Sequence, residues 1–139
     1  MKRFVLDASV ALAWFLDHPV PPQASRAREF LLSGGTSVVP ALWHLEMANG
    51  FAMAERRRIL TAAALDECLI KLNQLLAHQI ETSSTLISLR EALTTARSFH
   101  LSAYGAVYLD TARNQALPLA TLDSDLRAAA SKAGVDVIG

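Results

Sequence analysis

Three acidic residues, Asp7, Glu46 and Asp123, stand in separate segments that a folded chain could bring together. Asp7 directly follows the apolar run Phe4–Leu6, and Asp123 closely follows the apolar run Leu117–Ala120. Carboxylates that are held close together repel one another, and burial raises the pKa of each. A hard divalent cation resolves this conflict, because Mg²⁺ binds carboxylate, water and phosphate oxygens. The three acids therefore predict a divalent metal site able to activate water and to stabilise charge on a phosphoryl group.

Each acid alone has a simpler explanation. An aspartate after a strand often caps the next helix, so Asp123 or Asp125 could cap a helix that begins near Leu126. Glu46 could be an exposed helix charge, although its neighbours in the sequence are largely apolar. The arrival of three acids from three segments at one expected place favours the site over these alternatives.

Short apolar runs provide the strands that would position these acids. Runs without polar alternation are typical of parallel strands buried on both faces. Four such runs are clear and a fifth is weaker: Phe4–Leu6, Thr36–Val39, Leu117–Ala120, Val135–Ile138 and, weakest, Gln79–Thr82. Because ligands of such sheets bind beyond the carboxyl ends of the strands, we expect Asp7 and Asp123 to meet at two neighbouring strands.

The segments between these runs predict helices. Their expected ranges are Ala8–Leu16, Pro22–Leu32, Ala41–Arg57, Ala62–Ala77, Ile87–Phe99, Ala103–Gln115 and Leu126–Ala133. Thr61 and Ser102 stand at the positions of helix N-caps. Alternating strands and helices with right-handed crossovers predict an α/β protein, a three-layer α/β/α sandwich with a small parallel β-sheet. Residues 1–139 are expected to form it as a single domain.

The composition narrows the classes of function. The 139 residues are 52% hydrophobic and carry a formal net charge of zero. A neutral chain has no global attraction to nucleic acid, so such contact would need a local patch or a metal. The single cysteine, Cys68, excludes an internal disulfide and fits a reducing cytosol. No apolar run reaches the ~18 residues of a membrane span, so we expect a cytoplasmic protein without a membrane partner.

Four motifs, in their order and spacing, resemble those of PIN-domain ribonucleases of the VapC type, the toxins of bacterial type II toxin–antitoxin pairs. The motifs are Val5-Leu6-Asp7-Ala8-Ser9, Glu46-Met47-Ala48-Asn49, Leu101-Ser102-Ala103-Tyr104-Gly105-Ala106-Val107-Tyr108-Leu109 and Thr121-Leu122-Asp123. The resemblance extends from Phe4 to Val137. It implies a PIN-like domain and a metal-dependent endoribonuclease that hydrolyses RNA phosphodiesters.

The resemblance also implies roles for residues and a set of partners. Three acids would be the catalytic ligands of Mg²⁺ or Mn²⁺, namely Asp7, Glu46 and Asp123. Three further side chains would orient carboxylates or water by hydrogen bonding, namely Ser9, Asn49 and Thr121. The implied partners are an RNA substrate, a cognate VapB-like antitoxin and a second copy of the chain in a homodimer.

One position departs from the family pattern, since Gly105 stands where the family has an aspartate. With Ser102 as the N-cap, residue 105 is the third helical position, where acidic side chains are favoured. Glycine within a helix costs roughly 0.5–1 kcal/mol relative to alanine. Natural divergence or a deliberate inactivating substitution would each remove one metal ligand. We expect reduced or lost activity, and the alternative is a catalytically silent protein that binds its antitoxin or RNA without cleavage.

Two other aspartates could be considered as replacements for the missing acid. Asp110 lies five residues beyond Gly105, about 140° around a helix, and we expect it to point to solvent. Asp125 is the better replacement because it shares a loop with Asp123. We expect a weakened site that holds one metal, or one metal firmly and a second loosely.

Arg56, Arg57 and Arg58 form the only basic run. They end a predicted helix, where cations are favoured by the helix dipole. If that helix points toward the acids, the arginines could instead contact RNA phosphates.

Two other phosphate-handling classes fit the sequence poorly. A phosphoacceptor receiver domain needs an acid pair after the first strand, where only Asp7 stands, and a lysine after the fifth. A haloacid-type phosphotransferase needs a second aspartate at the position of Ser9.

Overall fold

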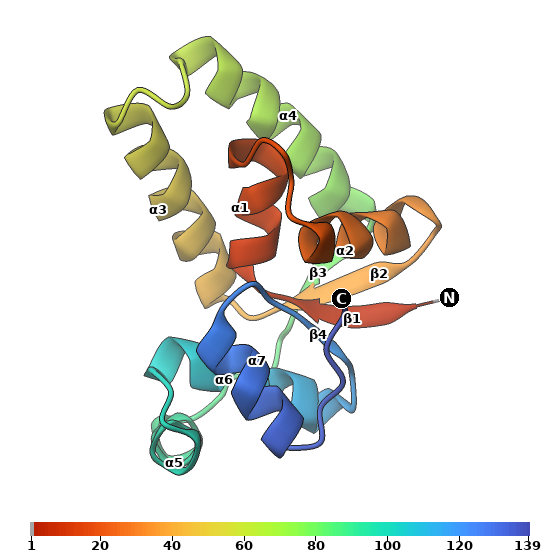
Figure 1. The fold of residues 1–139 in the computed structure, drawn as a ribbon, viewed down its shortest axis with the longest axis vertical. Coiled ribbons are helices and arrows are strands. Elements are labelled where there is room, and N and C mark those ends of the chain that lie inside the picture. The colour runs from red at the N-terminus through yellow and green to blue at the C-terminus, as the bar shows by residue number, and fades with distance from the viewer. Residues whose placement is uncertain (1) are drawn as a thin grey trace.

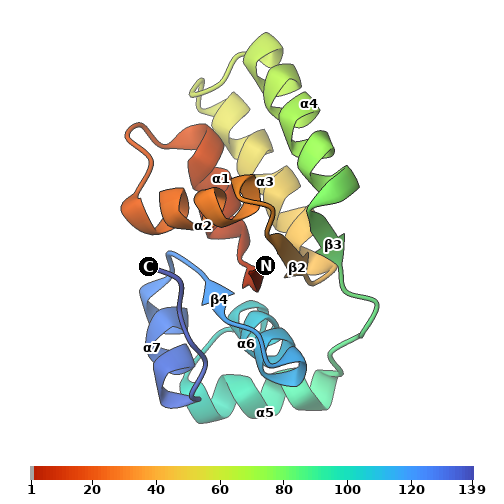
Figure 2. The same cartoon turned by 90° about the vertical axis from the view of Figure 1, so that its right-hand side faces the viewer.

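In the computed structural model, which describes residues 2–139, a four-stranded parallel sheet lies between two groups of helices. The strands are β1 (Arg3–Leu6), β2 (Thr36–Val39), β3 (Ile80–Thr82) and β4 (Leu119–Ala120), in the order β3-β2-β1-β4. Helices α1 to α4 lie on one side of the sheet and α5 to α7 on the other (Figures 1 and 2). The predicted three-layer α/β/α class is confirmed.

The described part of the chain has seven helices. They are α1 (Ala8–Leu16), α2 (Pro22–Leu32), α3 (Leu42–Arg56), α4 (Ala62–His78), α5 (Leu89–Phe99), α6 (Ala103–Gln115) and α7 (Ser124–Lys132). Thr61 and Ser102 are N-caps as predicted, because their hydroxyls accept from the backbone N–H groups of Ala64 and Gly105, both at 3.1 Å. Within residues 2–139, no helix is long and apolar enough to cross a bilayer.

Strand β1 is the centre of the core. Phe4, Val5 and Leu6 are fully buried, as expected for a strand covered by helices on both faces. Val5 pairs with Val38 of β2 on one side and with Leu119 of β4 on the other. The position of β1 fixes where the residue that follows it, Asp7, can lie.

The strand order also creates the place where a site can form. The chain passes from β1 to β2 and β3 on one side, then returns to add β4 on the opposite side of β1. In α/β sheets, ligands bind at the carboxyl ends of strands where the order reverses in this way. Asp7 follows β1 and Asp123 follows β4, so the expectation that both lie at the ends of neighbouring strands is confirmed.

Two strand predictions differ from the structure. Strand β4 is shorter than the run Leu117–Ala120, since Pro118 has no N–H and takes part only through its carbonyl, which accepts from Val5 at 2.8 Å. Val135–Ile138 forms a single bridge, from Val137 to Leu119, because β4 offers only two residues for pairing. The weak run Gln79–Thr82 does contain a strand, β3.

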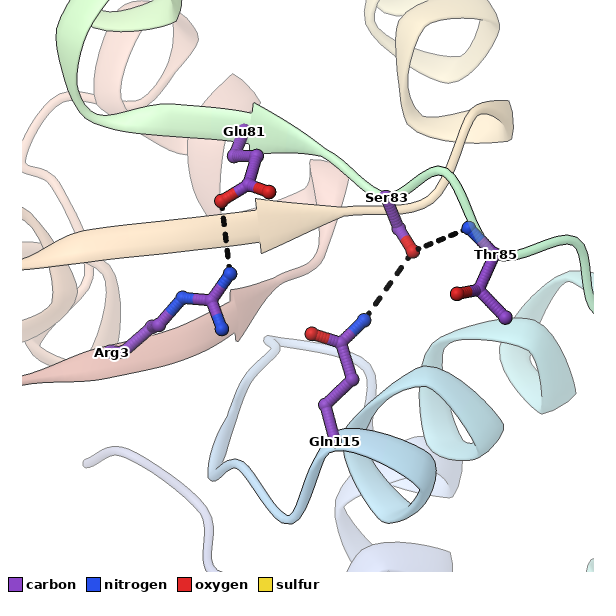
Figure 3. A network of polar contacts seen from close by, with 5 residues as sticks. All are labelled: Arg3, Glu81, Ser83, Thr85 and Gln115. Atoms are coloured by element: carbon purple, nitrogen blue, oxygen red, sulfur yellow. Dashed lines mark hydrogen bonds and ion pairs between the residues drawn. The ribbon is translucent and has the colours of Figure 1, made fainter.

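Polar contacts at the β3 edge of the sheet connect β3 to β1, and the segment after β3 to helix α6 (Figure 3). Arg3 of β1 reaches across β2 to form an ion pair with Glu81 at 2.9 Å. Beyond β3, the Ser83 hydroxyl accepts from the Thr85 N–H at 3.2 Å and from the Gln115 amide at 3.3 Å. The exposed ion pair is worth only about 0–1 kcal/mol. The Gln115 contact matters more for the site, because it connects the C-terminal end of α6 to the segment after β3. Helix α6 carries Tyr108.

Ala116, the C-cap residue directly after α6, adopts a left-handed conformation with φ 53° and ψ 46°. That conformation costs an L-residue roughly 1–2 kcal/mol. We expect Ala116→Gly to raise the free energy of unfolding by about 1 kcal/mol, measured by urea denaturation. The same change at Ala128, exposed within α7, should lower it by about 1 kcal/mol. Equal losses at both positions would contradict strain at Ala116.

Candidate functional site

The candidate site is built around the carboxylate of Asp7, which is only 7% exposed. The hydroxyls of Ser9 and Thr121 both donate to its Oδ2 atom, at 2.7 Å and 2.6 Å. Asp7 occupies the N-cap position of α1, yet its side chain makes no capping hydrogen bond. Its carboxylate is therefore held by side chains from α1 and from the segment after β4, and it does not serve the helix.

The same two hydroxyls also hold the loop between β4 and α7. Ser9 Oγ accepts from the backbone N–H of Leu122 at 3.1 Å, and Thr121 Oγ1 accepts from that of Asp123 at 3.0 Å. Since each hydroxyl has a single proton and already accepts an amide, its proton is directed to Asp7. The end of β1 and the loop after β4 are thereby locked in one arrangement.

Glu46, on the second turn of α3, is held by Tyr108 of α6. The phenol donates to Glu46 Oε1 at 2.6 Å and accepts from the backbone N–H of Ala8 at 3.3 Å. Burial, and then the negative charge of Asp7, raise the pKa of Tyr108, so the phenol stays protonated and remains a donor. Sequence reasoning missed Tyr108. Its place in the segment 101–109, three residues after Gly105, was the available signal.

Burial is the main cause of the perturbed pKa values at the site. It raises the pKa of Asp7, the hydrogen bonds from Thr121 and Ser9 lower it in part, and the charge of Asp123 raises it further. Burial likewise raises the pKa of Glu46, against the Tyr108 hydrogen bond, and the charge of Asp7 adds to the increase. Among residues 2–139, the one ion pair joins Arg3 to Glu81, so neither Asp7 nor Glu46 has a basic partner there.

Asp123 is exposed and serves as the N-cap of α7, since its Oδ1 accepts from the backbone N–H of Asp125 at 3.0 Å. The simpler explanation, capping, therefore holds for this residue. The cap engages one carboxylate oxygen, while the charge of Asp123 still acts on Asp7. Helix α7 begins at Ser124, earlier than predicted, because Asp123 provides this cap. Asp125 lies exposed in the first turn of α7.

Asn49 lies one turn beyond Glu46 on α3 and is exposed. Within the part of the chain that the structure describes, it takes no part in the hydrogen bonds that hold Asp7 and Glu46. The structure thus brings Ser9 and Thr121 to the acids and leaves Asn49 outside the network.

The donor set suits a hard cation, although the acids do not form a closed cage. Within residues 2–139, no group of three or more histidine, cysteine, aspartate or glutamate side chains lies close enough to hold a metal ion. Mg²⁺ needs no such cage, because it is commonly bound by one or two carboxylates together with waters and substrate phosphates. Asp7 and Glu46, with Asp123 at the edge, fit an open site of that kind.

Gly105 has room for a side chain. A Cβ atom built there would meet nothing nearer than Ser102 Oγ at 3.6 Å and Leu101 Cβ at 3.7 Å, which are ordinary contacts. Its φ angle lies outside the left-handed range in which glycine is needed. Residues 105 and 108 share a helix face, so a side chain at 105 would lie on the face that carries Tyr108. Neither space nor backbone torsion requires glycine at this position.

The prediction that Asp110 points to solvent is wrong. Asp110 is 6% exposed, and the hydroxyl of Thr95 donates to its Oδ1 at 2.6 Å. Its Oδ2 is buried and has no hydrogen-bond partner within residues 2–139. The reason is that α5 packs along this face of α6, which the sequence pattern did not reveal. Asp110 therefore faces α5 and not solvent.

The three arginines lie exposed at the far end of α3, at Arg56, Arg57 and Arg58. Helix α3 begins beside the sheet edge and runs away from it (Figure 1). Arg56 is therefore about 15 Å along the helix axis from Glu46. Helix α3 therefore carries the three arginines away from the acids and not toward them.

The chain is similar to known proteins in both sequence and fold. The PIN domain family matches residues 4–132, and the chain belongs to that family. The crystal structure of PAE2754 from Pyrobaculum aerophilum is similar, with 23% sequence identity, a TM-score of 0.68 and coverage of 99% of this chain and 91% of that chain. At this identity the likeness shows the fold alone. No curated protein matches the chain.

PIN domains are in general metal-dependent nucleases. Membership of the family therefore agrees with the class of chemistry that the acids at the ends of β1 and β4 predict. The fold is a nuclease fold, and the buried acids lie at the edge of the sheet where such a fold binds its ligands.

Thr121→Val should lower the free energy of unfolding by about 1–3 kcal/mol, because the fully buried hydroxyl serves both Asp7 and the Asp123 amide. Thr111→Val is a matched control, since that buried hydroxyl donates only to the Val107 carbonyl within α6. Its cost should be near the ~0.5–1.5 kcal/mol of one ordinary hydrogen bond. Urea denaturation of both variants measures the difference, and equal costs would show that the Thr121 bridge adds nothing.

Asp110→Asn should gain stability relative to the wild type as pH rises. Burial raises the pKa of Asp110 above 3.8, against the Thr95 hydrogen bond and the Arg113 charge, while Glu91 raises it further. Because the folded pKa exceeds the unfolded one, the contribution of Asp110 to stability is fully present below the unfolded pKa and is lost as pH rises through the folded pKa. Urea denaturation from roughly pH 3.5 to 7 measures the difference. A relative stability of the variant that falls with pH would show that ionised Asp110 stabilises the fold.

Proposed function

We propose that this chain is a metal-dependent endoribonuclease of the VapC-like toxin type whose activity is reduced or lost because Gly105 replaces one acid. The observation that carries the proposal is the buried carboxylate of Asp7, fixed by Ser9 and Thr121 at the switch point between β1 and β4. An ionised acid buried without a basic partner is costly for a structural protein, and a bound cation would stabilise it.

The metal ligands would be Asp7, Glu46 and Asp123, with Asp125 as a further candidate and Mg²⁺ or Mn²⁺ as the cation. A bound ion of this kind supplies Lewis acidity and a water of lowered pKa. The chain's own part is orientation, because each of the three acids has one oxygen fixed by a named donor. Ser9 and Thr121 fix Asp7, Tyr108 fixes Glu46, and the Asp125 amide fixes Asp123. Hydrolysis would leave 5′-phosphate and 3′-hydroxyl ends on RNA.

A second candidate function is a catalytically silent PIN-fold protein that binds its antitoxin or RNA without cleavage. Gly105 favours it, because a glycine cannot supply a metal ligand from its side chain. In either case we propose a cytoplasmic setting, a VapB-like antitoxin and a homodimer as partners. Large apolar side chains are exposed on α5 and near it, which would suit such partners: Leu86, Leu89, Leu93 and Tyr104. The arginines at 56–58 could contact RNA only at a distance from the acids.

Gly105→Asp should increase Mg²⁺-dependent cleavage of RNA, since position 105 has space for a side chain on the face that carries Tyr108. The increase should be at least about tenfold, the usual size of effect even for groups that only orient a ligand. Gly105→Ala is the matched control. It should raise the free energy of unfolding by about 0.5–1 kcal/mol without a gain in cleavage.

Cleavage is measured on labelled RNA with Mg²⁺ and again with excess chelator. Equal activity of the wild type and both variants would contradict a role for a carboxylate at 105. Equal gains from alanine and aspartate would attribute the effect to the helix and not to the metal. Absence of cleavage in every variant would favour the silent binding protein.

A further inference from the structure

We propose that Tyr108 is a positioning residue that holds Glu46 at a fixed place beside Asp7. The proposal rests on the proposed function, because it matters only if these two acids act together on a cation. The phenol donates to Glu46 Oε1 at 2.6 Å, a short distance typical of a hydrogen bond to a charged acceptor.

The phenol joins three segments that are far apart in the chain. It belongs to α6, donates to Glu46 across 62 positions in the sequence and accepts from the Ala8 N–H across 100 positions. Ala8 is the residue directly after Asp7. One hydroxyl group therefore connects the side chain of Glu46 to the backbone that carries Asp7, and so it sets the spacing of the two acids.

The contact from Ala8 also bears on Asp7 itself. The first four N–H groups of a helix have no partner within it, and the N-cap side chain usually serves only that of the second or third helical residue. At α1 the N-cap is Asp7, whose side chain makes no capping bond, while Tyr108 accepts from the Ala8 N–H. Tyr108 thus pairs with the N–H of the first helical residue, which an N-cap side chain does not usually serve, and it fixes the backbone directly beside Asp7.

Packing alone does not explain the phenol. Tyr108 is 1% exposed, so its ring would serve the core equally well as phenylalanine. A buried tyrosine hydroxyl needs a partner, but any backbone carbonyl would satisfy it. Here the hydroxyl has its amide donor and a half-buried carboxylate as acceptor, and its single proton is committed to Glu46. The ring stabilises the core, and the hydroxyl positions the acid.

The test uses Mn²⁺ as the probe and compares Tyr108→Phe, Glu46→Gln and the double variant by calorimetry. All are made in the wild-type chain and in the Gly105→Asp chain. Tyr108→Phe should weaken Mn²⁺ binding about tenfold or more, the usual effect of removing a group that orients a ligand. In the Glu46→Gln chain the same change should have little further effect, because the carboxylate it positions is gone. Tyr104→Phe, 66% exposed on the same helix, should leave binding unchanged.

A loss that is equal with and without the Glu46 carboxylate would assign Tyr108 to packing and overturn the proposal, as would no loss at all. A second measurement keeps the tyrosine in place and needs no metal. The Tyr108 hydroxyl proton, observed by NMR, should shift and exchange faster in Glu46→Gln, and an unchanged signal would overturn the proposal. If no chain binds Mn²⁺, the proposed function fails, and the hydroxyl signal alone then decides whether Tyr108 positions Glu46.

Discussion

The pair of hydroxyl bonds to Oδ2 of Asp7 is the interaction on which the site depends. Ser9 is the second residue of α1 and Thr121 directly follows β4, so both reach one oxygen atom only if β4 pairs beside β1. The same hydroxyls accept the Leu122 and Asp123 amides, which places Asp123 at the N-terminus of α7. The geometry of the acids is therefore a consequence of strand order, and it would be lost if β4 were added at the other edge.

A buried acid of this kind stabilises the fold only in part. The hydroxyl bonds favour the ionised carboxylate, while burial and neighbouring acids oppose it, and the net effect is a raised pKa. Glu46 shows the same balance, with Tyr108 in the place of the two hydroxyls. Polar groups at functional sites commonly reduce stability in return for orientation. Here the cost falls on Asp7 and Glu46, the two acids that side-chain hydroxyls hold in place, and this pattern agrees with the proposed cation site.

The sequence predicted the parts of the fold that depend on local pattern. Apolar runs located β1 and β2, and a helix boundary was correct where a cap such as Thr61 or Ser102 marked it. The prediction of a strand over Val135–Ile138 was wrong, because pairing depends on how many residues the neighbouring strand offers. The predicted exposure of Asp110 was wrong for a similar reason. A helical wheel gives the direction of a side chain, but it does not show that another helix, α5, packs on that side.

The site was predictable to the same extent. Asp7 and Asp123 follow from the rule that parallel strands end at one edge, and Glu46 from its helix after β2. Ser9 and Thr121 were assigned through the family resemblance, and the structure gives them bonds to Asp7. Tyr108 could not be derived, because its bonds join positions 62 and 100 residues apart. Such long-range contacts exist only once the layers have been assembled.

The effect of a side chain at position 105 depends on the nearby residue Tyr108. The two residues share a helix face, and Tyr108 meets Glu46 and the backbone beside Asp7. An acid at 105 would add a further negative charge to a cluster in which burial and mutual repulsion already raise the pKa of Asp7 and Glu46. Without a cation, that charge would make the fold less stable, whereas glycine costs only roughly 0.5–1 kcal/mol of helix stability relative to alanine. Glycine at position 105 therefore favours the metal-free fold, and it leaves in place the hydrogen bonds that hold Asp7, Glu46 and Asp123.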